Sequence, residues 1–133
     1  MERVTGIGGV FLRARDPEAL AAWYAEHLGV PIDAGQTYGT FTAGGTGAAG
    51  ETDGPEQTVW SAFPPDTEYL GEGEPAFMVN YRVADLDAMR AQLRAAGADV
   101  DERVENHAYG RFGWATDPEG NRFELWQPAG PGF

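Results

Sequence analysis

The second half of this chain repeats the strand and helix with which the first half opens. An apolar run ending at Arg13 is followed by Asp16 and a helix-forming segment, and a run ending near Arg82 is followed in the same way by Asp85. The two copies lie about 69 residues apart, and strand-forming segments follow each copy. Each copy alone is too short for a good core, so the two must share one. We therefore expect a single domain, 1–133, of two β-α-β-β-β units.

Local signals divide the first unit into a strand, a helix and further strands. Alternation of side chains predicts a strand over 4–14. Asp16 is a favourable N-cap, and Pro17 suits the first helical position. Gly29 is a typical helix end, so a helix is predicted over 17–28. Shorter strands are expected at 32–33, 38–42 and 59–63.

The second unit shows the same order of signals. A strand is predicted over 77–83, and a helix over 86–96 follows, with Asp85 as its N-cap and Gly97 at its end. Further strands are expected at 100–104, 109–115 and 121–127, with the turn Asp117-Pro118-Glu119-Gly120 between the last two. The chain thus divides into unit one at about 1–66, unit two at about 75–128, and loops at 43–55 and 66–75.

Charge and cysteine content exclude several classes of function. The formal net charge of −12 argues against nucleic acid and anionic membranes, which need clustered basic residues. Without cysteine there is no disulfide, thiol nucleophile or thiolate metal site. No signal peptide or apolar membrane span is recognisable, so we expect a cytoplasmic domain.

The layout of the charges is uneven. All nine basic residues are arginines, and none lies between Arg15 and Arg82, an interval that holds eleven acidic residues. One interpretation is a solvated acidic surface. The other is that arginines gather elsewhere to hold an anionic group.

Two segments resemble a known superfamily. The helix from Arg15-Asp16-Pro17-Glu18 to Gly29 and the element Asp117 to Leu125 resemble the vicinal oxygen chelate superfamily, which includes glyoxalase I, bleomycin-resistance proteins, fosfomycin-resistance proteins and extradiol dioxygenases. The stretch 109–126 is similar to the glyoxalase-like proteins of actinobacteria. The resemblance covers nearly the whole chain. It implies an α+β fold in which two tandem βαβββ units form an open, cup-shaped mixed sheet with the helices on its outer face.

The resemblance also implies where a divalent metal would bind. The ligand positions fall at Gly9, near Trp60-Ser61, at Met78 and at Glu124. Glycine has no side-chain donor and a thioether is a poor ligand for such metals. One carboxylate does not make a specific site. We therefore expect no metal and no other cofactor.

The two histidines offer only a partial replacement. His27 lies in the last turn of the first predicted helix, where a structural role is expected. His107 is expected in a loop between strands, either on the surface or reaching into the cup as an acid or base. A metal enzyme would have to recruit ligands from Glu56, His107 or a partner subunit.

Strand alternation predicts which side chains line the cup. The opposite faces of these strands, which carry Leu12, Tyr81 and Leu125, are expected beneath the helices. The candidate ligand-binding residues are Phe11, Arg13, Trp60, Met78, Asn80, Arg82, Trp114, Arg122 and Trp126, with Trp60 and Trp114 on the rim or wall. Ordinary core or dimer packing is the alternative for the aromatic residues. For Glu124 the alternative is an ion pair with Arg82, Arg122 or Arg111.

These features support two functions. The first is metal-independent binding of a small, partly aromatic or apolar molecule in the cup, as in bleomycin-resistance proteins. The second is an enzyme of the lyase or isomerase type, with Glu124 or His107 as general base and with or without a divalent metal. The resemblance also allows a dioxygenase-like reaction. A homodimer is expected in each case, since such proteins commonly complete their cups by pairing.

Overall fold

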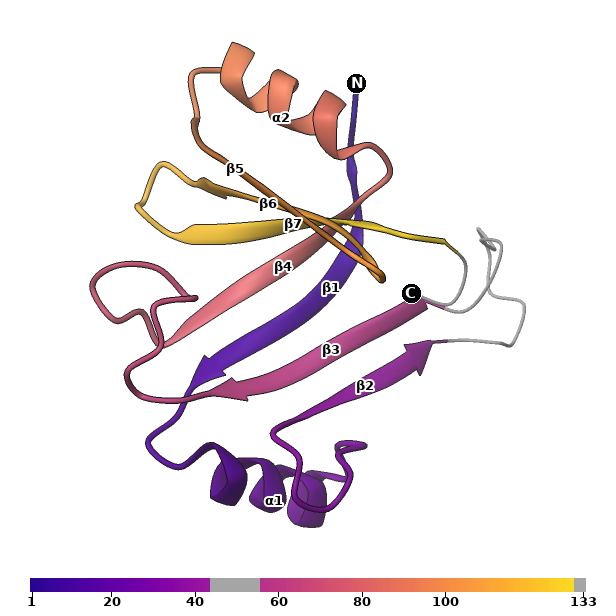
Figure 1. Ribbon diagram of the computed structural model, residues 1–133, viewed down its shortest axis with the longest axis vertical. Coiled ribbons are helices and arrows are strands. Elements are labelled where there is room, and N and C mark those ends of the chain that lie inside the picture. Colours follow the sequence, from indigo (N-terminus) through magenta and orange to yellow (C-terminus); the bar gives the residue numbers. More distant parts are fainter. Residues whose placement is uncertain (44–55, 131–133) are drawn as a thin grey trace.

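The computed structural model describes residues 1–43 and 56–130. These residues form one sheet of seven strands and two helices (Figure 1). In chain order the elements are β1 (Val4–Arg13), α1 (Pro17–Leu28), β2 (Tyr38–Ala43), β3 (Glu56–Phe63), β4 (Phe77–Val83), α2 (Leu86–Ala95), β5 (Asp99–His107), β6 (Gly110–Thr116) and β7 (Arg122–Pro128).

The repeated helix starts use the same local chemistry. The side chain of Asp16 accepts a hydrogen bond from the Ala19 backbone N–H, and that of Asp85 accepts one from Ala88. Each bond satisfies an amide that the helix itself leaves without a partner. Gly29 follows α1 in the left-handed conformation, with φ of 68°, which a glycine adopts without steric cost.

The sheet joins the two units through their first strands. Its order is β2-β3-β1-β4-β7-β6-β5, and β1 pairs with β4 antiparallel. Within the units, β1 pairs with β3 and β4 with β7 in parallel. The expected α+β fold with an open mixed sheet is therefore confirmed. The predicted strand at 32–33 is only a bridge between Ile32 and Gly39, next to Pro31, which has no N–H to donate to a ladder.

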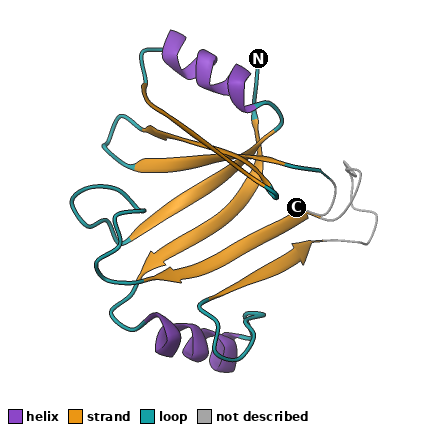
Figure 2. Ribbon diagram, viewed as in Figure 1, coloured by secondary structure: helices purple, strands orange, loops and turns teal. Residues whose placement is uncertain are grey.

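The helices lie at opposite ends of the sheet, on its outer face (Figure 2). A cluster that includes Ala21 and Trp60 packs beneath α1, and one that includes Leu86 and Leu125 packs beneath α2. A third cluster contains no helical residue and covers the inner face, which we call the cup: Phe11, Leu70, Met78, Phe112, Trp114 and Trp126.

Trp60 does not line the cup. It is 8% exposed and its ring centroid lies 4.9 Å from that of Tyr24 in α1, so it belongs to the outer face. Its neighbour Ser61 points inward instead, because successive side chains of a strand alternate between faces. The expectation that Trp60 forms a rim or wall of the cup is therefore wrong.

The segment between β3 and β4 carries core residues. The segment has no helix or strand, in agreement with the loop predicted at 66–75. Leu70 of this segment is nevertheless fully buried in the cup cluster. The Arg13 guanidinium holds this segment by donating to the carbonyls of Pro65, Thr67 and Pro75 at 2.8 to 2.9 Å. Arg13 thus fixes a loop of the chain, which was not expected. The other predicted loop, 43–55, lies outside the described residues except for Ala43, the last residue of β2.

The strand β5 is longer than the sequence predicts. It ends at His107, which pairs with Gly110 of β6, so His107 lies in a strand and not in a loop. The register of β5 and β6 shifts between Val100 and Val104. An irregular strand of this kind gives weak alternation, and its ends are therefore hard to locate in a sequence.

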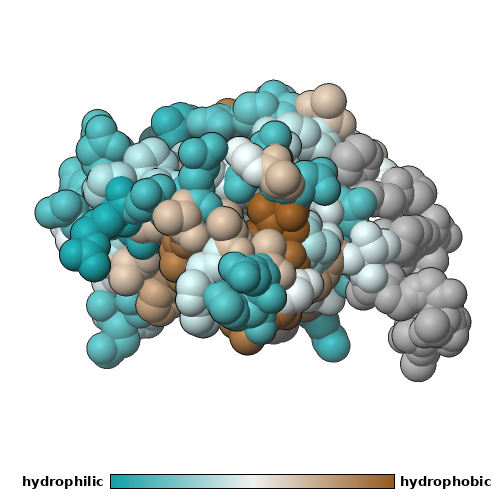
Figure 3. Space-filling view, turned by 90° about the horizontal axis from the view of Figure 1, so that it is seen from below, coloured by the Kyte–Doolittle hydropathy of each residue, from teal (hydrophilic) through white to brown (hydrophobic). Residues whose placement is uncertain are grey.

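The face at the α1 end of the molecule is mostly hydrophilic (Figure 3). Seen from the end of the molecule where α1 lies, hydrophobic residues form small areas within a polar face (Figure 3). Neither of the described helices has the length and apolar character needed to cross a lipid bilayer.

Leu70 provides a test of the packing of the loop. Leu70→Ala should lower the free energy of unfolding by about 2–5 kcal/mol, because it leaves a cavity in the cup cluster. Glu72→Ala, in the same loop and exposed, should change it by less than about 0.5 kcal/mol. Urea denaturation followed by tryptophan fluorescence measures both. Equal effects of the two substitutions would show that the loop is not packed in this way.

Candidate functional site

The register of the sheet places Glu124 between two polar side chains of neighbouring strands. Asn80 of β4 and Trp114 of β6 both pair directly with Glu124 of β7. Side chains of directly paired residues project to the same face of a sheet. All three therefore point into the cup.

Three donors converge on the Glu124 carboxylate. Its Oε1 accepts from Asn80 Nδ2 at 2.5 Å, and its Oε2 accepts from Trp114 Nε1 at 2.9 Å. The Tyr69 hydroxyl, which comes from the loop after β3, also donates to Oε2. Glu124 is 0% exposed, so these bonds replace the water that the carboxylate loses on folding.

Burial dominates the ionisation of this cluster. It raises the pKa of Glu124 above the ordinary range for glutamate, and it outweighs the hydrogen bonds from Tyr69, Asn80 and Trp114, which act in the opposite direction. Burial also raises the pKa of the Tyr69 phenol, and the charge of Glu124 raises it further. Tyr69 is therefore a hydrogen-bond donor at neutral pH.

Among the described residues, no arginine lies within ion-pair distance of Glu124, so the alternative of an ion pair with Arg82, Arg122 or Arg111 is not observed. Arg82 is buried, with its guanidinium carbon 4.7 Å from the centre of the Trp126 ring and its Nε 4.0 Å from Glu56. Arg122 donates to Asp101 at 3.4 Å, and Arg111 forms a two-pronged contact with Asp87 at 3.0 and 3.1 Å. The direct hydrogen-bond partners of the buried carboxylate are therefore neutral, and the charge of Arg122 also favours its ionised form.

A cavity of about 410 Å³ opens above Glu124. It is lined mainly by aromatic side chains, with a few polar groups around Glu124. The lining residues are Gly8, Phe11, Tyr38, Val59, Ser61, Phe63, Tyr69, Asn80, Glu105, His107, Tyr109, Phe112, Glu124 and Trp126. Its volume lies in the usual range for small-molecule sites.

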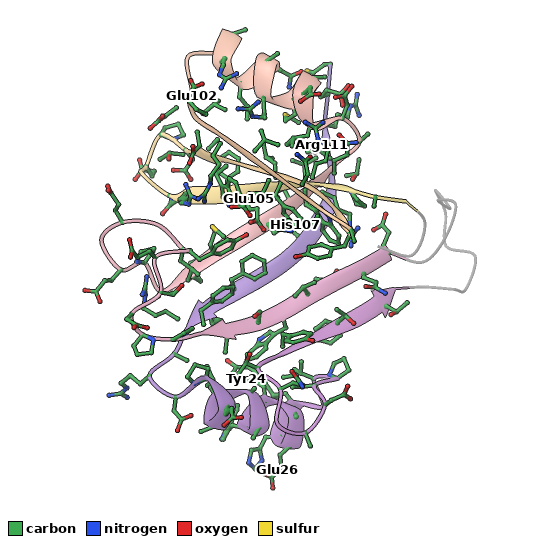
Figure 4. The ribbon with its side chains drawn as sticks, in the orientation of Figure 1. Tyr24, Glu26, Glu102, Glu105, His107 and Arg111 are labelled. Atoms are coloured by element: carbon green, nitrogen blue, oxygen red, sulfur yellow. The ribbon has the colours of Figure 1, made fainter. Side chains whose placement is uncertain are left out.

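Two titratable side chains reach the cavity from β5. Glu105 and His107 lie on the part of this strand that crosses the sheet, whereas Glu102 lies nearer α2 (Figure 4). His107 Nε2 lies 3.1 Å from Glu105 Oε1, and the His107 ring stacks on Tyr109 with centroids 5.2 Å apart. His107 is thus a wall residue of the cavity. His27, by contrast, is exposed on α1 and contacts Glu26 and Trp23.

The candidate ligand-binding residues divide into three groups. Those that line the cavity are Phe11, Asn80 and Trp126. Met78 and Trp114 are buried in the cup cluster beside it. The remaining four lie elsewhere. Arg13 holds the loop after β3, and Trp60 packs beneath α1. Arg82 stacks on Trp126, and Arg122 contacts Asp101.

The residues at the four expected metal positions do not fit a divalent cation. Gly9 has no donor, Met78 is 1% exposed within an apolar cluster, and the Ser61 hydroxyl is a weak ligand. Glu124 already accepts three hydrogen bonds, and a metal ion bound to it would have to displace these donors. Among residues 1–43 and 56–130, no group of three or more His, Asp or Glu side chains is placed to hold a metal.

A second hollow, of about 1240 Å³, lies between the loop after β3 and the turn before β7. It contains two arginines, but Arg13 is bound to backbone carbonyls and Arg122 to Asp101. Glu68, Glu72, Glu74, Asp66 and Asp117 also line it. This acidic wall does not favour the anionic group that the arginines would otherwise suggest.

Sequence reasoning missed several residues of the site. Tyr69 lies in a segment with no periodicity, so nothing in the sequence indicated that it reaches Glu124. Phe112 could have been predicted from the sequence, because it lies two residues before Trp114 in a predicted strand and therefore on the same face. Glu105 was not found, because the predicted strand ended at Val104.

Comparisons with known proteins agree with this fold. A family model described as a glyoxalase-like domain matches residues 9–126. A search of curated proteins found no match.

Solved structures show similar folds. The methylmalonyl-CoA epimerase from Mycobacterium tuberculosis is 26% identical, with a TM-score of 0.60, and the match covers 96% of this chain and 90% of that one. A variant of the methylmalonyl-CoA epimerase from Streptomyces coelicolor, in complex with 2-nitronate-propionyl-CoA, is 17% identical with a TM-score of 0.69. The match covers 96% of this chain and 100% of that one. A glyoxalase/bleomycin resistance protein/dioxygenase superfamily member from Vibrio splendidus is 13% identical with a TM-score of 0.55, over 95% and 98%.

The raised pKa of Glu124 predicts a pH dependence of stability. Between the usual glutamate value of about 4.3 and the raised value, the folded protein holds a proton that the unfolded chain has released. The contribution of Glu124 to stability is therefore full below about pH 4.3 and is lost as pH rises through the raised value. The Glu124→Gln variant cannot lose this contribution. The difference between its free energy of unfolding and that of the unmodified protein should therefore shift in favour of the variant as pH rises.

Urea denaturation at several pH values between about 4 and 8 measures this difference. Glu102→Gln is the matched control, since it removes a carboxylate from the same sheet whose side chain is 95% exposed. The same pH dependence in both variants would contradict the assigned burial of Glu124.

Proposed function

The chain belongs to the family of glyoxalase-like domains, and from that premise we propose that it captures a small, partly aromatic molecule in the cavity above Glu124 without the help of a metal. The cavity has the size and aromatic walls of such a site. The ligand would lie between the aromatic side chains and contact the polar groups at its floor.

The state of the Glu124 carboxylate carries this proposal. The three hydrogen bonds that it accepts, from Tyr69, Asn80 and Trp114, hold it rigidly and occupy most of its acceptor capacity. A general base must be within reach of the proton that it abstracts, with a free lone pair. A carboxylate held in this way suits a fixed wall of a binding site better than a group that changes its protonation in each reaction cycle.

A second function, proton transfer by an isomerase-type enzyme, is favoured by two observations. Structures similar to this one include methylmalonyl-CoA epimerases, one of them 26% identical. The pKa of Glu124 is also shifted upward by burial, in the direction that makes a carboxylate a more effective base near neutral pH. His107 in the cavity wall is the other candidate base.

Thermal unfolding in the presence of ligands tests the capture function. Small aromatic molecules of about 10–20 non-hydrogen atoms should include some that raise the melting temperature, since a ligand at 100 times its Kd adds about 2.7 kcal/mol of stability. Tyr38→Ala removes a half-exposed ring that lines the cavity and should reduce this shift. Phe41→Ala, in the same strand but outside the lining, should leave it unchanged. A large shift with Mn²⁺, Ni²⁺ or Zn²⁺, and none with any organic molecule, would contradict the proposal.

Solvent exchange tests the second function separately. In D₂O, an epimerase-type base would exchange the acidic C–H of methylmalonyl-CoA for deuterium, which proton NMR detects. On the capture proposal we expect no exchange above the uncatalysed rate. Exchange that is lost in Glu124→Gln, while the circular dichroism spectrum of the variant stays native, would establish the enzyme instead.

A further inference from the structure

The floor of the cavity offers mainly hydrogen-bond acceptors to a ligand. The phenol of Tyr69 and the indole of Trp114 each have one polar hydrogen, and both hydrogens point at Glu124. The side-chain amide of Asn80 donates one of its two hydrogens to Glu124 as well. The hydrogens around the central carboxylate are thus engaged in bonds to it. What remains for a ligand are the lone pairs of Tyr69 and Glu124 that are not in these bonds.

Asn80 adds an acceptor that has no partner. Its Oδ1 is buried and accepts no hydrogen bond within the part of the chain that the structure describes, although Asn80 is only 2% exposed and lines the cavity. The orientation of the amide is fixed, because exchanging its oxygen and nitrogen would place Oδ1 against the Glu124 carboxylate. A buried acceptor without a donor is unfavourable, and a ligand N–H would supply the missing partner.

The absence of a side chain at position 8 leaves Asn80 Oδ1 in place. A Cβ atom at Gly8 would overlap Oδ1 and would also approach the Trp126 ring at 2.9 Å. The register of β1 and β4 shifts between Ile7 and Gly9, so this glycine lies at an irregularity of the strand pair. Asn80 Oδ1 therefore packs directly against the backbone of β1, with no side chain at position 8 between them.

Apart from three tyrosines, the ionisable side chains of the lining are two carboxylates and one imidazole. Glu105 and Glu124 are carboxylates, His107 is the imidazole, and no arginine lines this cavity. Arg103 Nε lies 3.5 Å from Glu105 Oε2 and reduces the effect of that charge without removing it. The charged groups in contact with the cavity therefore favour a positive ligand over a negative one.

The walls also suit a positive ligand. Phe11, Phe63, Tyr69, Phe112 and Trp126 present rings to the cavity, and the Phe112 and Trp126 rings stack on each other at 5.8 Å. Aromatic faces attract ammonium groups and also pack against flat apolar bodies. The same walls thus accommodate both parts of an aromatic amine.

We propose that the ligand of this cavity is an organic cation: a protonated amine on an aromatic or apolar body, with its N–H groups directed at Asn80 Oδ1 and the Glu124 carboxylate. This inference rests on the proposed capture function and narrows its ligand class. It excludes molecules whose buried end is a carboxylate or a phosphate, since these would place acceptors and negative charge against the acceptors of the floor.

Three probes of similar shape and different charge test the inference. They are 2-(1-naphthyl)ethylamine, 2-(1-naphthyl)ethanol and the anion of 1-naphthaleneacetic acid, with isothermal titration calorimetry at pH 7 as the measurement. The amine should bind about tenfold more tightly than the alcohol, and the acid should bind more weakly than both. Equal affinities, or tighter binding of the alcohol or the acid, would overturn the cation inference while leaving capture of an aromatic molecule intact. No binding by any of the three would overturn the cation inference, and the broader melting-temperature screen would then decide the capture function.

A pair of charge variants locates the effect in the cavity. Glu105→Gln should weaken binding of the amine about 2- to 5-fold and leave that of the alcohol unchanged, since a partly exposed ion pair contributes modestly. Glu102→Gln changes the net charge equally but lies outside the cavity lining, and it should affect neither probe. Equal weakening of the amine by both variants would show that the overall charge of the protein, and not this cavity, selects the cation.

Discussion

The buried carboxylate of Glu124 is the interaction on which the rest of the site depends. It joins three parts of the chain through the hydrogen bonds of Tyr69, Asn80 and Trp114, which come from the loop after β3, from β4 and from β6. A buried charge is stable only when such partners replace its water, so the loop and both strands must take these positions together. Arg13 supports the arrangement from outside by holding the carbonyls on either side of Tyr69.

The two units contribute differently to the cup. In the internal repeat, Phe11 of unit one is equivalent to Asn80 of unit two. Phe11 pairs with Ser61, and Asn80 pairs with Glu124, so Ser61 and Glu124 are equivalent as well. Unit one therefore supplies a ring and a small hydroxyl where unit two supplies the polar floor. This difference between equivalent positions places the acceptors of the floor on unit two, whereas both units supply aromatic rings to the cavity. It also removes the donor set that a metal would need.

Much of the fold could be predicted because its signals are local. The caps at Asp16 and Asp85 and the repeated strand pattern identified the helices and the central strands. The contacts of the site depend on tertiary structure and were less accessible. Tyr69 and Leu70 lie in a loop, where no periodicity reports burial. The alternative of an ion pair between Glu124 and an arginine is not observed among the described residues, because strand register brings the neutral Asn80 and Trp114 alongside Glu124, while Arg82 stacks on Trp126 and Arg122 contacts Asp101.

The ionisation of Glu124 in the folded protein tests the account most directly. The ¹³Cδ signal of Glu124, assigned by its loss in Glu124→Gln, can be followed by NMR as a function of pH, with and without excess Zn²⁺. We expect a midpoint above the usual glutamate value of about 4.3 that Zn²⁺ does not change. A midpoint at or below that value, or one that Zn²⁺ lowers, would contradict a buried, metal-free carboxylate held by neutral donors.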